Sequence, residues 1–248
     1  MAKEKNKHQM LLFKDFRLEQ IAFEVRYIYG NYYPDKLLQF WEEIQNQLTG
    51  QYTPLKEEES TIINYNDKFE IRVSADRFAV IQFFPDSSIK ELLKVSQVFF
   101  DTTIKILEIK EIKRVGLRSI YTKDYDNPSA VAEALFQTPY INYPDDLYLI
   151  ENSTPFIPNL ALGWQNEEKG ISYRLNGKSE IVGITLPLRL IASGDFQKKI
   201  EKTYNQVLLD IDIYVHKPIL PGQFFSDEWI NQAYDTVRKE GIKFFGEK

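Results

Sequence analysis

The chain has 248 residues, of which 31 are lysine or arginine and 36 are aspartate or glutamate, so its net charge at neutral pH is -5. It contains no cysteine, which excludes a disulfide framework, a thiolate metal site and a cysteine nucleophile, and which favours a reducing compartment. The acidic balance disfavours nucleic-acid binding through phosphate contacts. The charged N-terminal sequence and the lack of a long apolar run predict a cytoplasmic protein without membrane association.

The first half alternates between strand and helix patterns. Alternating apolar residues predict a strand over residues 19–29, and apolar residues at helical spacing predict a helix over residues 34–48. Three short strands follow, at residues 61–65, 69–73 and 78–84, with turns at Asn66-Asp67 and at Ser74 to Asp76. A helix with an apolar stripe from Ile89 to Ile106 and a strand over residues 112–121 complete this half.

The second half is predicted to be mostly strand. A short helix over residues 130–136 precedes a proline-rich crossover at residues 138–159, which carries a brief strand at 147–150. Asn176-Gly177 is a strong hairpin signal, so it predicts a turn between two of the strands that follow. The predicted strands are residues 160–165, 171–175, 181–191 and 206–216, and a closing helix covers residues 225–245.

These elements predict an α+β fold with a curved antiparallel sheet and helices packed on one face. The order β-α-β-β-β-α-β followed by α-β-β-β-β-α suggests two halves of similar design. We expect residues 1–14 to form a mobile tail, residues 15–126 an N-terminal half and residues 127–248 a C-terminal half, all in one continuous globular unit.

One predicted strand concentrates chemically useful side chains. In an extended chain Asp210, Asp212, Tyr214 and His216 project to the same face. Two carboxylates and an imidazole at this spacing could hold a divalent cation, as in a metal-dependent phosphodiesterase or nuclease. The simpler interpretation is an antiparallel strand with one apolar face and one solvated polar face, and it is the one we prefer. We therefore assign no metal, no cofactor and no catalytic residue.

A second strand carries Arg114 and Arg118 on one face with Gly116 between them. Two guanidinium groups beside a glycine gap could hold a phosphate or a carboxylate, because the gap lets another molecule approach the backbone. They could equally form ion pairs with Asp210 and Asp212 on a neighbouring strand, and we favour this structural role. Arg114, Gly116, Arg118, Asp210 and Asp212 are thus the candidate residues for ligand or partner binding.

The segment Lys113-Arg114-Val115-Gly116-Leu117-Arg118-Ser119-Ile120 resembles the strand motif Arg-Val/Ile-Gly-Leu-Arg-Tyr-Ile-Asn of a sporadically distributed prokaryotic family of roughly 250-residue proteins of unknown function. The strand with Phe23-Glu24-Val25-Arg26, the Asp210-Ile211-Asp212 strand and the closing helix fit the same family in order, so the likeness spans almost the whole chain. Ser119 and Tyr121 replace the usual tyrosine and asparagine. The resemblance carries no activity with it, and the patchy occurrence of the family implies an accessory gene, such as part of a defence or toxin-antitoxin system.

We expect a non-enzymatic protein-interaction or regulatory module that binds a protein partner or another copy of itself. Aromatic residues make up 14% of the chain and anchor interfaces well, whereas neither a Gly-x-Ser-x-Gly elbow nor a glycine-rich phosphate loop is present. Two alternatives stay open. One is a metal-dependent phosphodiesterase that uses the Asp210 and Asp212 face, and the other is an anion-binding or nucleotide-binding sensor that uses Arg114 and Arg118.

Overall fold

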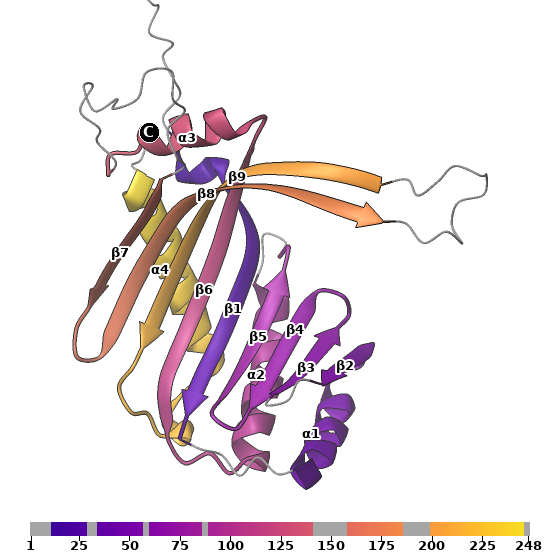
Figure 1. Cartoon of the computed structure of the whole chain (residues 1–248). Helices are drawn as coiled ribbons and strands as arrows, with labels where there is room; N and C mark the ends of the chain where they lie inside the picture. Colours follow the sequence, from indigo (N-terminus) through magenta and orange to yellow (C-terminus); the bar gives the residue numbers. More distant parts are fainter. Residues whose placement is uncertain are drawn as a thin grey trace, which may run out of the picture.

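A computed structural model describes residues 11–28, 34–56, 60–85, 89–140, 158–185 and 199–245. Within these ranges nine strands form one antiparallel sheet in the order β2-β3-β4-β5-β1-β6-β9-β8-β7 (Figure 1). The strands are β1 (Arg17–Tyr27), β2 (Tyr52–Lys56), β3 (Ser60–Tyr65), β4 (Phe69–Ser74), β5 (Arg77–Phe83), β6 (Ile112–Tyr125), β7 (Asn159–Gln165), β8 (Lys169–Thr185) and β9 (Lys199–Val215).

The helices pack against one face of this curved sheet, as predicted (Figure 1). They are α1 (Pro34–Gln47), α2 (Lys90–Ile106), α3 (Pro128–Phe136) and α4 (Ser226–Phe245), with short 3-10 turns η1 (Phe13–Asp15) and η3 (Pro221–Gln223). Strand alternation decides which face they cover. Ile21, Phe23 and Val25 of β1 are fully buried beneath the helices, whereas Glu24 and Arg26 lie on the opposite side, which we call the open face. The α+β fold class is therefore confirmed.

The apolar core lies between the sheet and the helices in two clusters, one beneath α1, α2 and the first half of α4 and the other beneath α3 and the second half of α4. In the first cluster Phe23 meets Phe78 edge to face at 5.9 Å between ring centroids, and Phe40 of α1 contacts Phe99 of α2. The abundant aromatic residues thus mostly fill the core, where each large ring removes much apolar surface from water.

The sheet contains two halves of similar design. The element order is β1-α1-β2-β3-β4-β5-α2 in the first half and β6-α3-β7-β8-β9-α4 in the second. β1 and β6 pair at the centre, and β5, β4 and β3 on one side correspond to β9, β8 and β7 on the other. By this correspondence of strand order, β6 is the counterpart of β1.

Two strands differ from the sequence prediction. β2 was not predicted, and its Pro54 is tolerated because β2 is an edge strand in the described sheet. The hairpin turn predicted at Asn176-Gly177 is wrong, since both residues lie inside the continuous strand β8. They pair with Leu208 and Val207 of β9, so the long partner strand overrides the local turn preference. Beyond Asn176 the ribbon of β8 and β9 continues past the end of β7 (Figure 1).

Part of the expected mobile tail is packed. Leu11 is only 2% exposed, and the Phe13 ring lies edge to face with Tyr121 at 5.0 Å. The same ring fills the space beside Gly241 of α4, where a Cβ atom would lie 2.4 Å from it. Leu11 and Phe13 of the expected tail therefore pack within the second core cluster. Residues 1–10 lie outside the described residues, as do the predicted strand at 147–150 and residues 186–191 of another predicted strand.

No helix in the described ranges is long and apolar enough to cross a membrane.

Candidate functional site

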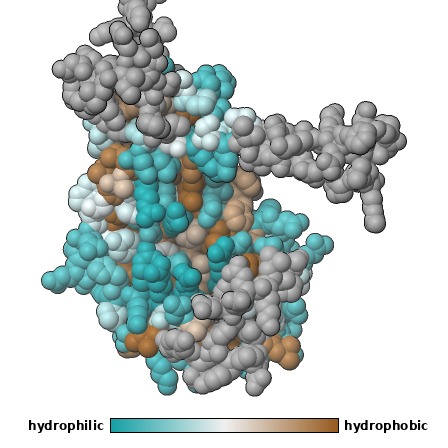
Figure 2. Space-filling model, in the orientation of Figure 1, coloured by the Kyte–Doolittle hydropathy of each residue, from teal (hydrophilic) through white to brown (hydrophobic). Residues whose placement is uncertain are grey.

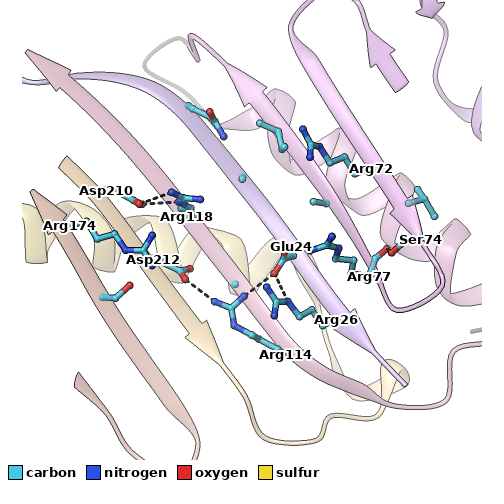
Figure 3. A pocket seen from close by; sticks show the side chains of 17 residues that line it. Glu24, Arg26, Arg72, Ser74, Arg77, Arg114, Arg118, Arg174, Asp210 and Asp212 are labelled. Carbon is cyan, nitrogen blue, oxygen red and sulfur yellow. Dashed lines mark hydrogen bonds and ion pairs between the residues drawn. The ribbon is translucent and has the colours of Figure 1, made fainter. Parts of the chain in front are cut away.

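The open face carries a hollow of about 420 Å³ in the middle of the sheet. Residues of six neighbouring strands, β4, β5, β1, β6, β9 and β8, line it, and its charged lining consists of six arginines and three carboxylates. Figure 2 shows the open face as mostly hydrophilic, with some apolar surface between the polar side chains. The charged residues are labelled in Figure 3: Arg26, Arg72, Arg77, Arg114, Arg118, Arg174, Glu24, Asp210 and Asp212.

Arg114 lies at the centre of the hollow and is held by two carboxylates. Its Nη1 donates to Glu24 at 3.0 Å, and its Nη2 donates to Asp212 at 2.7 Å (Figure 3). Its guanidinium group also lies over the Tyr214 ring, 4.6 Å from the ring centroid. All three charged side chains are about three-quarters buried, so these ion pairs are better shielded from water than surface pairs.

Gly116 makes this arrangement possible. A Cβ atom at position 116 would lie 2.9 Å from Nη1 of Arg114, so the guanidinium group occupies the space that a side chain would need. The gap expected for another molecule is therefore filled by the protein itself. Gly170 has the same relation to Tyr214, whose ring would lie 2.4 Å from a Cβ atom there.

Arg118 and Asp210 form a second, two-point ion pair. Nε and Nη2 of Arg118 donate to the two carboxylate oxygens of Asp210 at 2.9 and 2.7 Å. The pairing of β6 with β9 places Ile120 opposite Asp210 and Arg118 opposite Asp212, so the partners are diagonal neighbours across the two strands. Arg114 and Arg118 thus meet Asp210 and Asp212 in ion pairs, which is the structural role favoured from the sequence.

The carboxyl group of Asp212 is in a mixed environment. Burial raises its pKa above the ordinary value, because desolvation disfavours the charged form, while the neighbouring Arg114 acts in the opposite direction. Burial is the larger effect, so the pKa of Asp212 is raised on balance. The ion pair with Arg114 therefore compensates a desolvated charge and does not leave a carboxylate free for a ligand.

The residues of the metal-site hypothesis, Asp210, Asp212 and His216, are engaged with other groups of the protein. Asp210 and Asp212 line the hollow as predicted, but both are bonded to arginines. His216 bonds through Nε2 to the main-chain oxygen of Asn166 at 2.9 Å. Among the residues that the structure describes, no group of three or more acidic or histidine side chains could hold a metal ion.

Four arginines and one glutamate of the hollow were not among the sequence candidates: Arg26, Arg72, Arg77, Arg174 and Glu24. The alternation of β1 did place Glu24 and Arg26 on the polar side. Nothing in the sequence, however, shows that the β4–β5 hairpin and β8 bring their arginines to the same place, because the pairing of β5 with β1 and of β9 with β6 is long-range.

Four of the six arginines fall into two kinds. In Arg114 and Arg118 the Nη atoms donate to carboxylates. Arg26 and Arg72 instead donate only through Nε in the described part of the chain, to Glu24 at 2.8 Å and to Glu70 at 2.6 Å. Their Nη atoms remain available to a ligand, whereas the candidates Arg114 and Arg118 mainly hold the site together.

Comparison with known proteins gives no relative: no family model matches the chain, and no curated protein matches it.

Proposed function

We propose that the protein is a non-enzymatic cytoplasmic interaction module whose open face binds an acidic segment of a partner protein. The observation that carries the proposal is the charge of the hollow, where six arginines face three carboxylates in a chain whose net charge is -5. A positive hollow on an otherwise acidic molecule attracts a negatively charged partner and repels most others. The accessory role implied by the family resemblance belongs to the same proposal.

The form of the hollow supports an extended ligand. It crosses six neighbouring strands, and strands lie about 4.8 Å apart, so it is roughly 24 Å wide. This width suits a segment of several residues better than one small molecule. The lining side chains also stand on paired strands, which position them more rigidly than loops would.

The engaged carboxylates argue against hydrolysis. A metal-dependent phosphodiesterase needs acidic side chains that are free to bind the ion, whereas Arg114 and Arg118 hold Asp212 and Asp210. Titration of Mn²⁺ into the protein in a calorimeter tests this alternative. Heat of binding that disappears in Asp212→Asn would support the hydrolase and contradict our proposal.

The test of the proposal is binding of a fluorescent glutamate-rich peptide, measured by anisotropy at low and high salt. We expect binding that weakens with salt and that falls at least about tenfold when Arg77 and Arg174 are both changed to glutamate. The matched control is Arg238→Glu, a change of an exposed arginine on α4, in the helical layer. No binding by the parent protein, or an equal loss in the control, would refute the proposal.

Self-association is the alternative that a second experiment tests. A second copy could offer its acidic surface to the hollow, because the chain as a whole is negatively charged. Sedimentation velocity over a range of protein concentrations measures this directly. A dimer that dissociates in the Arg77→Glu, Arg174→Glu variant would show that the partner is another copy, and would replace the proposed partner protein.

A further inference from the structure

The open face contains a row of three arginines that stand directly opposite one another. Arg77 of β5 pairs with Arg26 of β1, and Arg26 pairs with Arg114 of β6. Arg72 of β4 stands opposite Ala79, two residues along β5 from Arg77, and so is a diagonal neighbour of the row. Like charges directly opposite each other destabilise a sheet, so this arrangement calls for a compensating anion.

The protein compensates the row only in part. One oxygen of Glu24, Oε1, accepts hydrogen bonds from both Arg26 and Arg114. In the described part of the chain Glu70 accepts a hydrogen bond from Arg72 and from no other arginine. The Arg77 guanidinium group has no hydrogen-bond or ion-pair partner among the described residues, although the turn carboxylate Asp76 lies beside it in sequence and bonds to Ser74.

The free Nη donors of Arg26 and Arg72 are already oriented. The bonds through Nε fix the planes of the Arg26 and Arg72 guanidinium groups, and the side chains remain 49% and 52% exposed. In Figure 3 Arg26 and Arg77 lie close to Glu24, whereas Arg72 extends from β4 farther along the sheet. A guanidinium group whose plane is already fixed loses little conformational entropy when it binds a ligand. Its remaining N–H donors therefore favour a ligand with several acceptor oxygens.

We propose that Arg26 and Arg77, with Arg72 flanking them, form a subsite for a phosphoryl group. A phosphoryl group has three terminal oxygens and close to two negative charges, so it can accept hydrogen bonds from more than one guanidinium group at once. A carboxylate has two oxygens, which match the paired N–H donors of one guanidinium group. The inference rests on the proposed function and deepens it, because a phosphorylated side chain in the acidic partner segment would supply this group.

The test compares a glutamate-rich peptide that carries one phosphoserine with the same peptide carrying glutamate at that position. We expect the phosphorylated peptide to bind at least about tenfold more tightly, and we expect this ratio to disappear in Arg77→Ala. Arg77→Lys keeps the positive charge but lacks the paired N–H donors of a guanidinium group, so the affinity ratio of the two peptides should fall most of the way to one. Arg238→Ala is the control that should keep it, and thermal melting of each variant verifies folding.

Inorganic phosphate provides an independent arm. At constant ionic strength it should shift the NMR signals of the arginine Nε–H groups of the subsite, and chloride should not. Peptides of equal affinity together with no phosphate shift overturn the subsite while the proposed function stands. A phosphate shift without binding of either peptide supports the subsite and overturns the proposed partner.

Discussion

Replacing Gly116 by alanine tests how the centre of the hollow is built. The backbone at this position is not in the left-handed region, so alanine is compatible with it. The new Cβ atom would however lie 2.9 Å from Nη1 and 3.3 Å from Cζ of Arg114. The guanidinium group must move by several tenths of an ångström, which weakens its bonds to Glu24 and Asp212 and its contact with the Tyr214 ring.

The expected cost follows from the exposure of these groups. The side chains of Arg114, Glu24 and Asp212 are 20%, 24% and 25% exposed, so each ion pair contributes about 1 kcal/mol, between the values for surface and buried pairs. The contact with Tyr214 adds about 0.5 kcal/mol. Removing a glycine from a strand gains about 0.5 kcal/mol in return. We therefore expect Gly116→Ala to lower the free energy of unfolding by about 1–2 kcal/mol and the melting temperature by roughly 2–8 °C.

Urea unfolding of a double-mutant cycle provides the measurement. In an Arg114→Ala background the added methyl group meets no guanidinium group, so Gly116→Ala should cost nothing there. Gly163→Ala on β7 is the matched control, because a Cβ atom there has its nearest neighbours at 3.7 and 3.8 Å. If Gly116→Ala costs the same in both backgrounds, the assigned role of Gly116 is incorrect.

Three other predictions concern the ion pairs, the tyrosines and the core. Arg118→Ala should lower the free energy of unfolding by about 1 kcal/mol in urea titrations, because it leaves Asp210, which is 13% exposed, without its partner; an unchanged midpoint would argue against the pair. Burial raises the pKa of Tyr125 from the ordinary 10 to about 12, so its contribution to stability is present below pH 10 and is lost as the pH rises through 12. A pH titration followed by tyrosinate absorbance should show one group fewer ionising near pH 12 in the Tyr125→Phe variant than in the parent protein. Phe23→Ala should cost about 3–5 kcal/mol in thermal or urea unfolding, since Phe23 is fully buried, and a cost below 1 kcal/mol would contradict its place in the core.

Much of the fold could be predicted because the code for it is local. β1 follows from the alternation of residues 21 to 27, and α3 begins where Asn127 accepts from the amide of Ala130 ahead of the turn that Pro128 opens. The turn at Asn66-Asp67 is also local, since both residues adopt the left-handed conformation that this pair tolerates. Where long-range pairing competes with a local signal, as at Asn176-Gly177, the local signal loses.

The candidate site was predictable only in part. The spacing of Arg114 and Arg118 and of Asp210 and Asp212 placed each pair on one face, and their ion pairing was the favoured interpretation. The arginines with free Nη atoms were missed because the pairing of β5 with β1, which brings Arg77 beside Arg26, joins strands far apart in the sequence. Arg114 in β6 bonds to Glu24, which is 90 residues away in the sequence, and to Asp212, which is 98 residues away. No local sequence pattern predicts contacts at such separations.

The sequence by itself determined which side of each strand is polar, because alternation of side chains is a property of any extended chain. Only the tertiary structure decided which charges neutralise each other and which remain for a ligand. That decision depends on strand order and register, since shifting one strand by two residues would give Arg77 a different neighbour from Arg26. The positive hollow is thus a product of assembly, although every residue that forms it is visible in the sequence.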